Sequence, residues 1–201
     1  MFDGRELVTG AAMTEEATAA DRLLDHFERV AGSPGSLTRV SPPEASAQVF
    51  VSVHRGFPEP DSICGFTMGL SNVHSPTSDG PPHRELFIAM TDTREDWAFA
   101  VAFLAHQLQG RCGFTTGDVI NFREEIAESS RMTGFLVTPA ALLGADDADV
   151  DQGFRQVAIR QLVPLYESER AWLLDGGDDS AFLGRFSPSQ LMDPHRPVFQ
   201  P

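Results

Sequence analysis

The sequence has little positive charge and contains no lysine. All 15 basic residues are arginine, against 29 acidic residues, which gives a formal net charge of -14. Nucleic acid and anionic membranes repel a protein of this charge, so neither is expected as a partner. The charge favours a basic protein partner, or it serves only to keep the protein soluble.

Cysteine is also scarce, and nothing in the sequence resembles a signal peptide. The chain has 2 cysteines, Cys64 and Cys112, far apart in sequence and in apolar surroundings. This is no disulfide framework, and it fits a reducing compartment. The N-terminus is charged where a signal peptide has an apolar core. The most apolar stretch is shorter than the roughly 18 residues of a membrane span. We therefore expect a cytoplasmic protein.

The length of 201 residues suits a single domain with a sizeable core. Thr14 is the expected start of a first helix, which runs to about Val30 with Glu15 and Glu16 in its first turn. Residues 1–13 are therefore predicted to be a flexible N-terminal tail, and residues 14–201 one domain.

A helix over residues 93–108 is the clearest element of the pattern. Thr93 is its expected N-cap, and Trp97, Val101, Leu104 and Leu108 recur at helical spacing. A second apolar face, with Phe99 and Phe103 along it, predicts that the helix is buried on more than one side.

The remaining pattern predicts an α+β fold. Strands are expected at residues 48–54, 63–71, 85–90, 132–138 and 154–166, with a short extended piece in 113–121 and helices at 167–174 and 180–186. Residues 145–151 read as an acidic loop. The expected sheet is mixed or mostly antiparallel, has about five or six strands and carries packed helices.

Motifs for catalysis or metal binding fail on inspection. The segment 69–73 has Val73 where a nucleophile elbow needs its second glycine. Asp147, Asp149 and Asp151 have the spacing of a calcium loop, but neither its turn glycine nor its final glutamate follows. The run 83–85 lacks the cysteine pair of a zinc deaminase. We expect no cofactor, no metal and no enzyme, and we interpret Cys64 and His54 as structural residues.

Several blocks of sequence resemble the Suppressor-of-fused domain, in its single-domain bacterial form. The resemblance covers residues 48–199 and rests on MGLS (68–71), ELFI (85–88), the Trp97-led helix, FTTGDVI (114–120), the segment 157–169 and MDPHR (192–196). It implies a non-catalytic fold that binds other proteins. Bacterial members of this type are associated with toxin systems as immunity proteins.

The resemblance marks six family-pattern positions, which we interpret as structural: turn glycines, a turn aspartate and a charge pair near the C-terminus. They are Gly69, Ser71, Gly117, Asp118, Glu169 and Arg196. Candidate partner-binding residues lie in the loop 72–82 and in the acidic loop. They are Asn72, His74, Asp79, Asp146, Asp147 and Asp149.

The resemblance predicts a non-catalytic immunity or neutralising protein. Its expected partner is another protein, and a basic toxin domain is one candidate. Two alternatives stay open at this point: a regulator that sequesters a transcription or signalling factor, and a hydrolase whose constellation the sequence does not reveal. A deep pocket with convergent titratable groups would favour the hydrolase.

Overall fold

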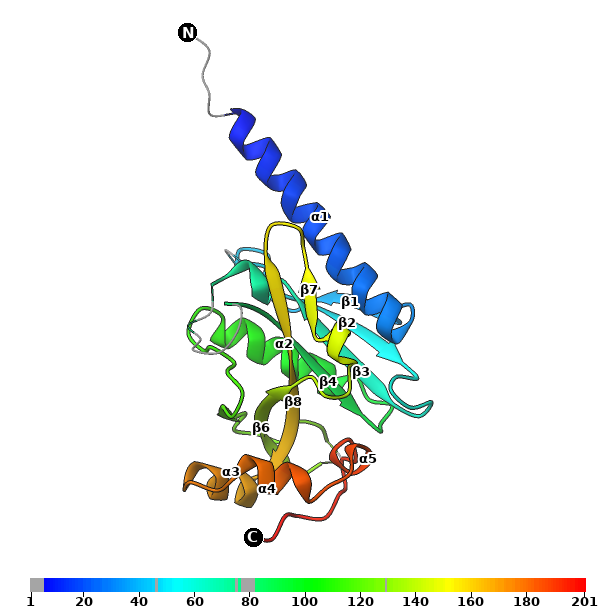
Figure 1. Ribbon diagram of the computed structural model, residues 1–201, viewed down its shortest axis with the longest axis vertical. Coiled ribbons are helices and arrows are strands. Elements are labelled where there is room, and N and C mark those ends of the chain that lie inside the picture. Colours follow the sequence, from blue (N-terminus) through cyan, green and yellow to red (C-terminus); the bar gives the residue numbers. More distant parts are fainter. Residues whose placement is uncertain (1–5, 46, 75, 77–81, 129) are drawn as a thin grey trace.

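The computed structural model describes residues 6–45, 47–74, 76, 82–128 and 130–201, with side chains described from Thr18 onward. Its centre is an 8-stranded sheet in the order β1-β2-β3-β4-β8-β6-β5, with β7 paired to β8 (Figure 1). The strands are β1 (Ser36–Arg39), β2 (Phe50–Arg55), β3 (Ile63–Met68), β4 (His83–Met90), β5 (Val119–Asn121), β6 (Met132–Pro139), β7 (Asp149–Asp151) and β8 (Gln156–Tyr166).

The sheet is mixed, which confirms the predicted fold class. Every ladder is antiparallel except that between β4 and β8, in which His83 is opposite Val157 and Phe87 is opposite Gln161. The predicted strand count was too low, because β1 and β7 were missed. β7 has three residues and one apolar side chain, Val150. A segment this short cannot show the alternation of apolar and polar residues by which a strand is predicted from sequence. Its pairing with β8 makes it a strand.

Helix α2 (Asp96–Leu108) packs on one face of the sheet against β2, β3 and β4. Trp97, Val101 and Leu104 are buried as expected, whereas Leu108 is only partly buried. The expected second buried face is wrong at Phe103, whose side chain is 47% exposed. At that position the helix is covered by the sheet on one side, and Phe103 lies on the side that is exposed.

The predicted cap of α2 is wrong. The N-cap is Glu95, without a side-chain hydrogen bond. Asp92 instead organises the turn: its Oδ1 accepts from the backbone N–H groups of Thr93 and Arg94, and its Oδ2 accepts from Trp97 Nε1 at 2.9 Å. An aspartate can bind nearby amides in this way as well as a threonine can, and here it also holds the buried indole.

Helix α1 (Glu6–Ala31) covers part of the opposite face, where Leu23 and Phe27 are buried against Phe66. It begins at Glu6 and not at Thr14. Residues 7–13 contain no proline, and their leucine, alanines and methionine offset the weaker helix formers Val8, Thr9 and Gly10. Figure 1 shows its N-terminal half extending beyond the sheet. The predicted flexible tail is thus helical from Glu6, and residues 1–5 lie outside the described residues.

Three short helices close the other end of that face: α3 (Glu167–Leu174), α4 (Asp179–Gly184) and α5 (Pro188–Leu191). They cover Leu136, Val163 and Leu165 of the sheet. Across the described ranges, no helix combines the length and the apolar character needed to cross a membrane.

Candidate functional site

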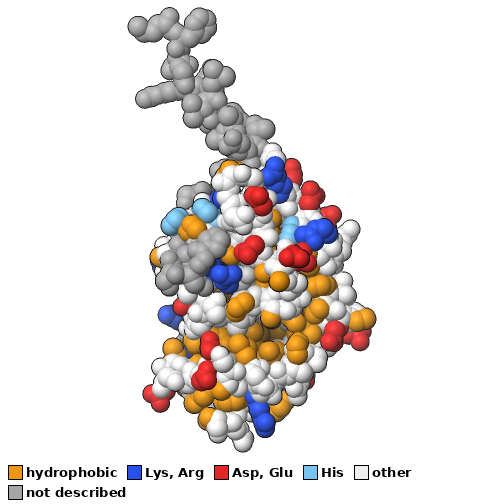
Figure 2. Space-filling view, viewed as in Figure 1, with side chains coloured by type: hydrophobic (Ala, Val, Ile, Leu, Met, Phe, Trp, Pro, Cys, Tyr) orange, Lys and Arg blue, Asp and Glu red, His pale blue; other side chains and the backbone are white. Residues whose placement is uncertain are grey.

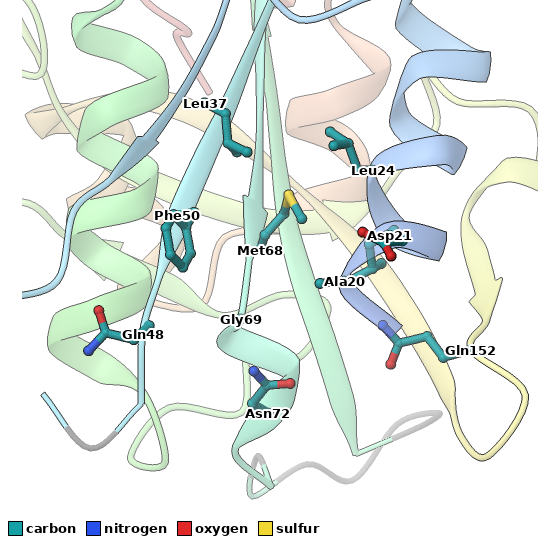
Figure 3. Close-up of a pocket in the computed structure, with 11 residues that line it drawn as sticks. Ala20, Asp21, Leu24, Leu37, Gln48, Phe50, Met68, Gly69, Asn72 and Gln152 are labelled. Carbon is teal, nitrogen blue, oxygen red and sulfur yellow. The ribbon is translucent and has the colours of Figure 1, made fainter. Parts of the chain in front are cut away.

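A groove lies between α1 and the first strands of the sheet, with a cavity of ≈ 230 Å³. We call it the α1 groove. Its apolar walls are formed by Ala20, Leu23, Leu24, Leu37, Phe50 and Met68, and its polar residues are Asp21, Gln48, Asn72 and Gln152. Figure 3 shows Leu37, Phe50 and Met68 from the strands on one side, Leu24 from α1 on the other, and Gln48, Asn72 and Gln152 toward one end.

Strand alternation places the apolar strand residues on one face. Phe50 is opposite Met68 in the β2–β3 ladder and opposite Arg39 in the β1–β2 ladder. Side chains two residues apart on a strand share a face, so Leu37 lies on the same face as Phe50 and Met68. Helix α1 meets this face with its buried stripe, and the flank carrying Ala20 and Leu24 leaves the groove open toward β1.

The buried carboxyl group of Glu85 shapes the end of the groove. Gly69 has φ 102°, and a Cβ there would overlap the carbonyl oxygen of Gln48, so only glycine fits. Glu85 Oε1 accepts from the backbone N–H of Gly69 at 2.8 Å and of Ser71 at 3.0 Å, and its Oε2 accepts from Thr67 Oγ1 at 2.6 Å. Burial raises the pKa of this carboxyl above its ordinary value, although these hydrogen bonds act against the rise.

The predicted partner-binding residues of the loop 72–82 contact different parts of the protein. Asn72 is exposed in the groove, where its Oδ1 accepts from Arg155 Nη2 at 2.7 Å. His74 is exposed, and its ring meets the edge of the His83 ring at 5.8 Å between centroids. Asp79 lies outside the described residues. Sequence reasoning missed Arg155, which holds the turn at Asn72 from 83 residues away in sequence.

The acidic residues of the segment 145–151 lie on the other flank of α1, away from the groove. There a shallow polar hollow is lined by Arg22, Asp25, His26 and Arg29 of α1 and by Asp146, Asp149, Val150 and Asp151. Asp146 and Asp149 are exposed, but Asp147 pairs with Arg29 at 2.7 Å. The interpretation of 145–151 as a loop is therefore corrected: it contains a 3-10 turn and β7, and Asp147 attaches it to α1.

His26 completes this attachment. Arg29 Nη2 donates to His26 Nδ1 at 2.8 Å, so the ring hydrogen is on Nε2, which donates to the carbonyl oxygen of Asp147 at 3.0 Å. Burial lowers the pKa of His26, and the charge of Arg29 lowers it further, against the hydrogen bond to Asp147. The imidazole is neutral in this arrangement.

The other family-pattern positions lie in turns and at the C-terminus. Gly117 has φ 92°, and Asp118 Oδ2 accepts from the N–H of Thr115 at 2.7 Å, which closes a turn that requires glycine. Glu169 and Arg196 are fully buried and joined by hydrogen bonds of 2.6 and 2.7 Å. Both features are structural in their contacts, and neither lines the α1 groove.

A second apolar hollow, of ≈ 240 Å³, lies between β6, β8 and the C-terminal helices. Leu142, Val163, Leu183, Phe186 and Leu191 line it. Figure 2 shows apolar side chains gathered in the middle of this face, below a more charged region near α1. This hollow is lined by β6 and β8, each of which has a strand on both sides, whereas the α1 groove includes Leu37 of the edge strand β1.

Cys64 and His54, the two residues considered for catalysis, are both buried, and the ring of His54 is hydrogen-bonded on both nitrogens. Cys64 is 1% exposed, and burial raises the pKa of its thiol to about 12. His54 is bound to Ser52 Oγ at 2.7 Å and to the carbonyl oxygen of Gly32 at 2.6 Å. In the described ranges, no three histidine, cysteine, aspartate or glutamate side chains gather as metal ligands do.

Solved structures of other proteins share this fold. The chain superposes on a SUFU (suppressor of fused protein) homologue from Neisseria gonorrhoeae with a TM-score of 0.66 and 16% identity, covering 94% of this chain and 100% of that one. It superposes on the Sufu–Fu complex structure with a TM-score of 0.68 and 15% identity, covering 90% of this chain and 91% of that one. For Drosophila Suppressor of Fused the TM-score is 0.53 at 14% identity, covering 88% of this chain and 50% of that one.

At these identities the structural likeness describes the fold alone. A search among curated protein sequences finds no match. The family model described as Suppressor of fused protein (SUFU), however, matches residues 47–197, well over half of the chain. This confirms the resemblance found in the sequence: the chain belongs to the Suppressor of fused family.

Proposed function

We propose that this chain is a non-catalytic protein-binding domain that neutralises a basic partner, as an immunity protein of a toxin system does, and that the partner docks at the α1 groove. The observation that carries the proposal is the character of the groove: apolar walls from α1 and three strands, with Asp21 as the one ionisable side chain among the described residues that line it. Such a surface suits recognition of side chains and offers no set of groups for acid–base chemistry.

Family and charge support the same function. A solved structure of the family fold is a Sufu–Fu complex, in which that protein is found with another one. The net charge of -14 creates a negative field that would draw in a basic protein. The hydrolase alternative has less support, because Cys64 and His54 are buried and engaged. Sequestration of a transcription or signalling factor differs from immunity in the partner and not in the binding surface.

The test is titration calorimetry of this protein with the protein encoded beside its gene. Tight binding together with loss of the partner's toxicity would support neutralisation. Binding without any toxicity of the partner would favour the sequestering regulator, and absence of binding would contradict the proposal. Leu24→Arg should abolish binding, whereas Leu142→Arg, at the second hollow, should leave it unchanged.

Association kinetics separate charge steering from groove contacts. If the acidic flank steers the partner, the on-rate should fall steeply with salt and fall again in the double variant Asp146→Asn/Asp149→Asn. Asp147 is kept in that variant, since its ion pair with Arg29 attaches the loop to α1. An on-rate that neither salt nor the variant changes would exclude the acidic flank.

A further inference from the structure

The outer side of α2 carries an exposed aromatic residue. Phe103 is 47% exposed, although apolar residues run along two sides of α2 and predict that both are covered. Its ring meets that of Phe122 edge to face at 6.4 Å between centroids, and Phe122 meets the fully buried Phe135 in the same way at 5.9 Å. A series of aromatic rings thus runs from the core to the surface and ends in a ring that solvent reaches.

Two open hollows of opposite charge meet at these rings. Phe103 and Phe122 line both hollows, and we call the pair the α2 ridge. The acidic hollow, of ≈ 490 Å³, is lined by four carboxylates and one arginine: Asp96, Glu124, Glu125, Glu128 and Arg94. The basic hollow, of ≈ 470 Å³, is lined by two arginines and, among the described residues, by no carboxylate; they are Arg111 and Arg123.

Two carboxylates of the acidic hollow have no cation of their own. Arg94 pairs with Asp96 at 3.0 Å and with Glu128 at 2.7 Å, so these three charges satisfy one another. Glu124 and Glu125 are exposed and form no ion pair within the described ranges. The acidic hollow therefore has two carboxylates available to an incoming cation.

The two arginines of the basic hollow are equally without an anion. Arg111 donates to the carbonyl oxygen of Gln107, and neither Arg111 nor Arg123 forms an ion pair in the part of the chain that the structure describes. Arg123 has φ 75°, which is uncommon for a residue other than glycine, and its backbone N–H donates to Asn121 Oδ1 at 2.8 Å. At this turn Arg123 lines the basic hollow and the next residue, Glu124, lines the acidic one.

We propose that this face binds the same face of a second copy of the chain, as a two-fold symmetric dimer. In such an interface each contact occurs twice, so the surface must be complementary to itself. A two-fold axis through the α2 ridge sets ridge against ridge and brings the acidic hollow of each copy to the basic hollow of the other. An aromatic centre with charged residues at the rim is the usual arrangement of a protein interface.

Charge selects a second copy over other occupants. A basic segment would be repelled by the basic hollow and an acidic one by the acidic hollow, whereas a second copy satisfies both. The net charge of -14 on each copy opposes their approach at long range. At 0.15 M salt the Debye length is roughly 8 Å, so this repulsion is largely screened while charges in contact still attract.

The dimer goes beyond the proposed function and does not depend on it. Helix α2 packs in the core on one face of the sheet, and α1 packs on the opposite face. A dimer through the α2 ridge therefore leaves both α1 grooves open, and it would hold two partner molecules.

Sedimentation of the full chain over a range of concentrations at about 0.15 M salt tests the dimer. The wild type should change from monomer to dimer as its concentration rises. Phe103→Asp should raise the dissociation constant of the dimer at least about tenfold, because it removes the aromatic centre. Phe154→Asp is the matched control: Phe154 is 55% exposed and lines neither hollow, so the dimer should be unchanged.

Charge reversal tests the symmetry of the contact. Glu124→Arg/Glu125→Arg makes both hollows basic, and Arg111→Glu/Arg123→Glu makes both acidic, so each variant alone should dimerise at least about tenfold more weakly than the wild type. Mixed in equal amounts, the two variants should form a heterodimer, because each basic hollow then meets an acidic one. A misfolded variant would not regain association in the mixture.

Three results would overturn the inference. They are a wild type that stays monomeric at its highest soluble concentration, a dimer that Phe103→Asp leaves intact, and a mixture of the charge-reversed variants that forms no heterodimer. The second result would place the contact between copies on another face.

These outcomes are distinct from failure of the proposed function. Leu24→Arg, in the α1 groove, should leave the dimer intact, and Phe103→Asp should leave the binding of a partner at that groove intact. A dimer that binds no partner would remove only the proposed function. A monomer that binds its partner would remove only the dimer.

Discussion

Glu85 shows how one buried side chain can define a local structure. Its carboxyl group accepts from the backbone N–H groups of Gly69 and Ser71 and from the hydroxyl of Thr67, while Thr67 Oγ1 in turn accepts from the N–H of Leu86. A single acceptor thus fixes the end of β3, the 3-10 turn that follows it (Leu70–Asn72) and β4. The MGLS block of the sequence is explained by this acceptor, which lies outside the block.

Removing the acceptor should be costly, and replacing it should depend on pH. Glu85→Ala removes the acceptor of the buried Ser71 N–H and of the partly buried Gly69 N–H, at up to roughly 1–3 kcal/mol for each. Glu85→Gln keeps an acceptor and cannot ionise. Because burial raises the pKa of Glu85, the native state holds its proton above pH 4.5, where the unfolded state has lost it. Wild-type stability therefore declines as pH rises through this range.

Urea unfolding of the wild type and of Glu85→Gln between pH 4 and pH 8 measures this effect. The stability of the glutamine variant relative to the wild type should increase with pH. A relative stability that decreases with pH would show that the hydrogen bonds outweigh burial and that the carboxylate is ionised in the native state.

At the scale of elements, α2 provides a comparison between neighbouring side chains. Leu104 is 6% exposed and Phe103 is 47% exposed on the same helix. Leu104→Ala should cost about 2–5 kcal/mol, as core truncations do. Phe103→Ala should cost less than about 1 kcal/mol. Chemical denaturation of the two variants tests the assignment, and equal losses would show that the outer side of α2 is covered as well.

The attachment of α1 to the acidic segment should weaken in acid. The pKa of His26 is lowered in the native state, so the unfolded state binds more protons as pH falls below about 6.5. Protonation also places a hydrogen on Nδ1, which then can no longer accept from Arg29. Stability should therefore fall between pH 6.5 and pH 5 by more in the wild type than in His26→Gln.

The pH difference between these two proteins isolates His26. His54, whose pKa is also lowered by burial, contributes in the same direction but is present in both. Hydrogen exchange in residues 18–31 would locate the effect on α1. Parallel stability curves for the two proteins would contradict a role for His26.

The elements differed in how far the sequence could predict them. Helix α3 and the strands β2, β3, β4, β6 and β8 carry clear periods and were predicted to within a few residues. β1 has the exposure pattern of an edge with a single apolar residue, Leu37, and β7 exists only through its ladder with β8. The start of α1 was missed because Met13-Thr14 resembles a helix start although the preceding residues also favour a helix.

The α1 groove lay beyond sequence reasoning for a geometric reason. Its walls come from α1, β1, β2 and β3 and from Gln152, which donates to the carbonyl oxygen of Ala19 from 133 residues away. The one available signal was that Ala20 and Leu24 widen the apolar stripe of α1 toward one flank. The acidic residues, by contrast, were visible as charge, but Asp147 proved to be an internal ion-pair partner.

At the scale of the whole molecule, the pair of Glu169 and Arg196 secures the C-terminal segment to the sheet. Arg196 also donates to the carbonyl oxygen of Pro164 at 3.0 Å, and Glu169 accepts from the N–H of Phe199 at 2.8 Å. Glu169 further accepts from the N–H of Tyr166, at the start of α3. One ion pair therefore connects β8, α3 and the last residues of the chain.

Breaking this pair should release the segment. Arg196→Met leaves a buried carboxylate without its cation, at a cost of about 3–5 kcal/mol. The double variant Glu169→Gln/Arg196→Met should recover part of the loss, because the uncompensated charge is gone. Thermal unfolding gives the free energies, and limited proteolysis near Pro197 reports the release. A double variant less stable than Arg196→Met would contradict this account.

The single parallel ladder between β4 and β8 divides the chain into two consecutive halves. Within the described residues, strands β1–β4 pair with one another and strands β5–β8 pair with one another, and the β4–β8 ladder joins the two groups. Helix α2 lies between the two groups in sequence. Each half can form its ladders from nearby residues, whereas joining β4 to β8 closes a long loop. We therefore expect folding to proceed by separate formation of the halves, with the seam between β4 and β8 closing last and limiting the rate.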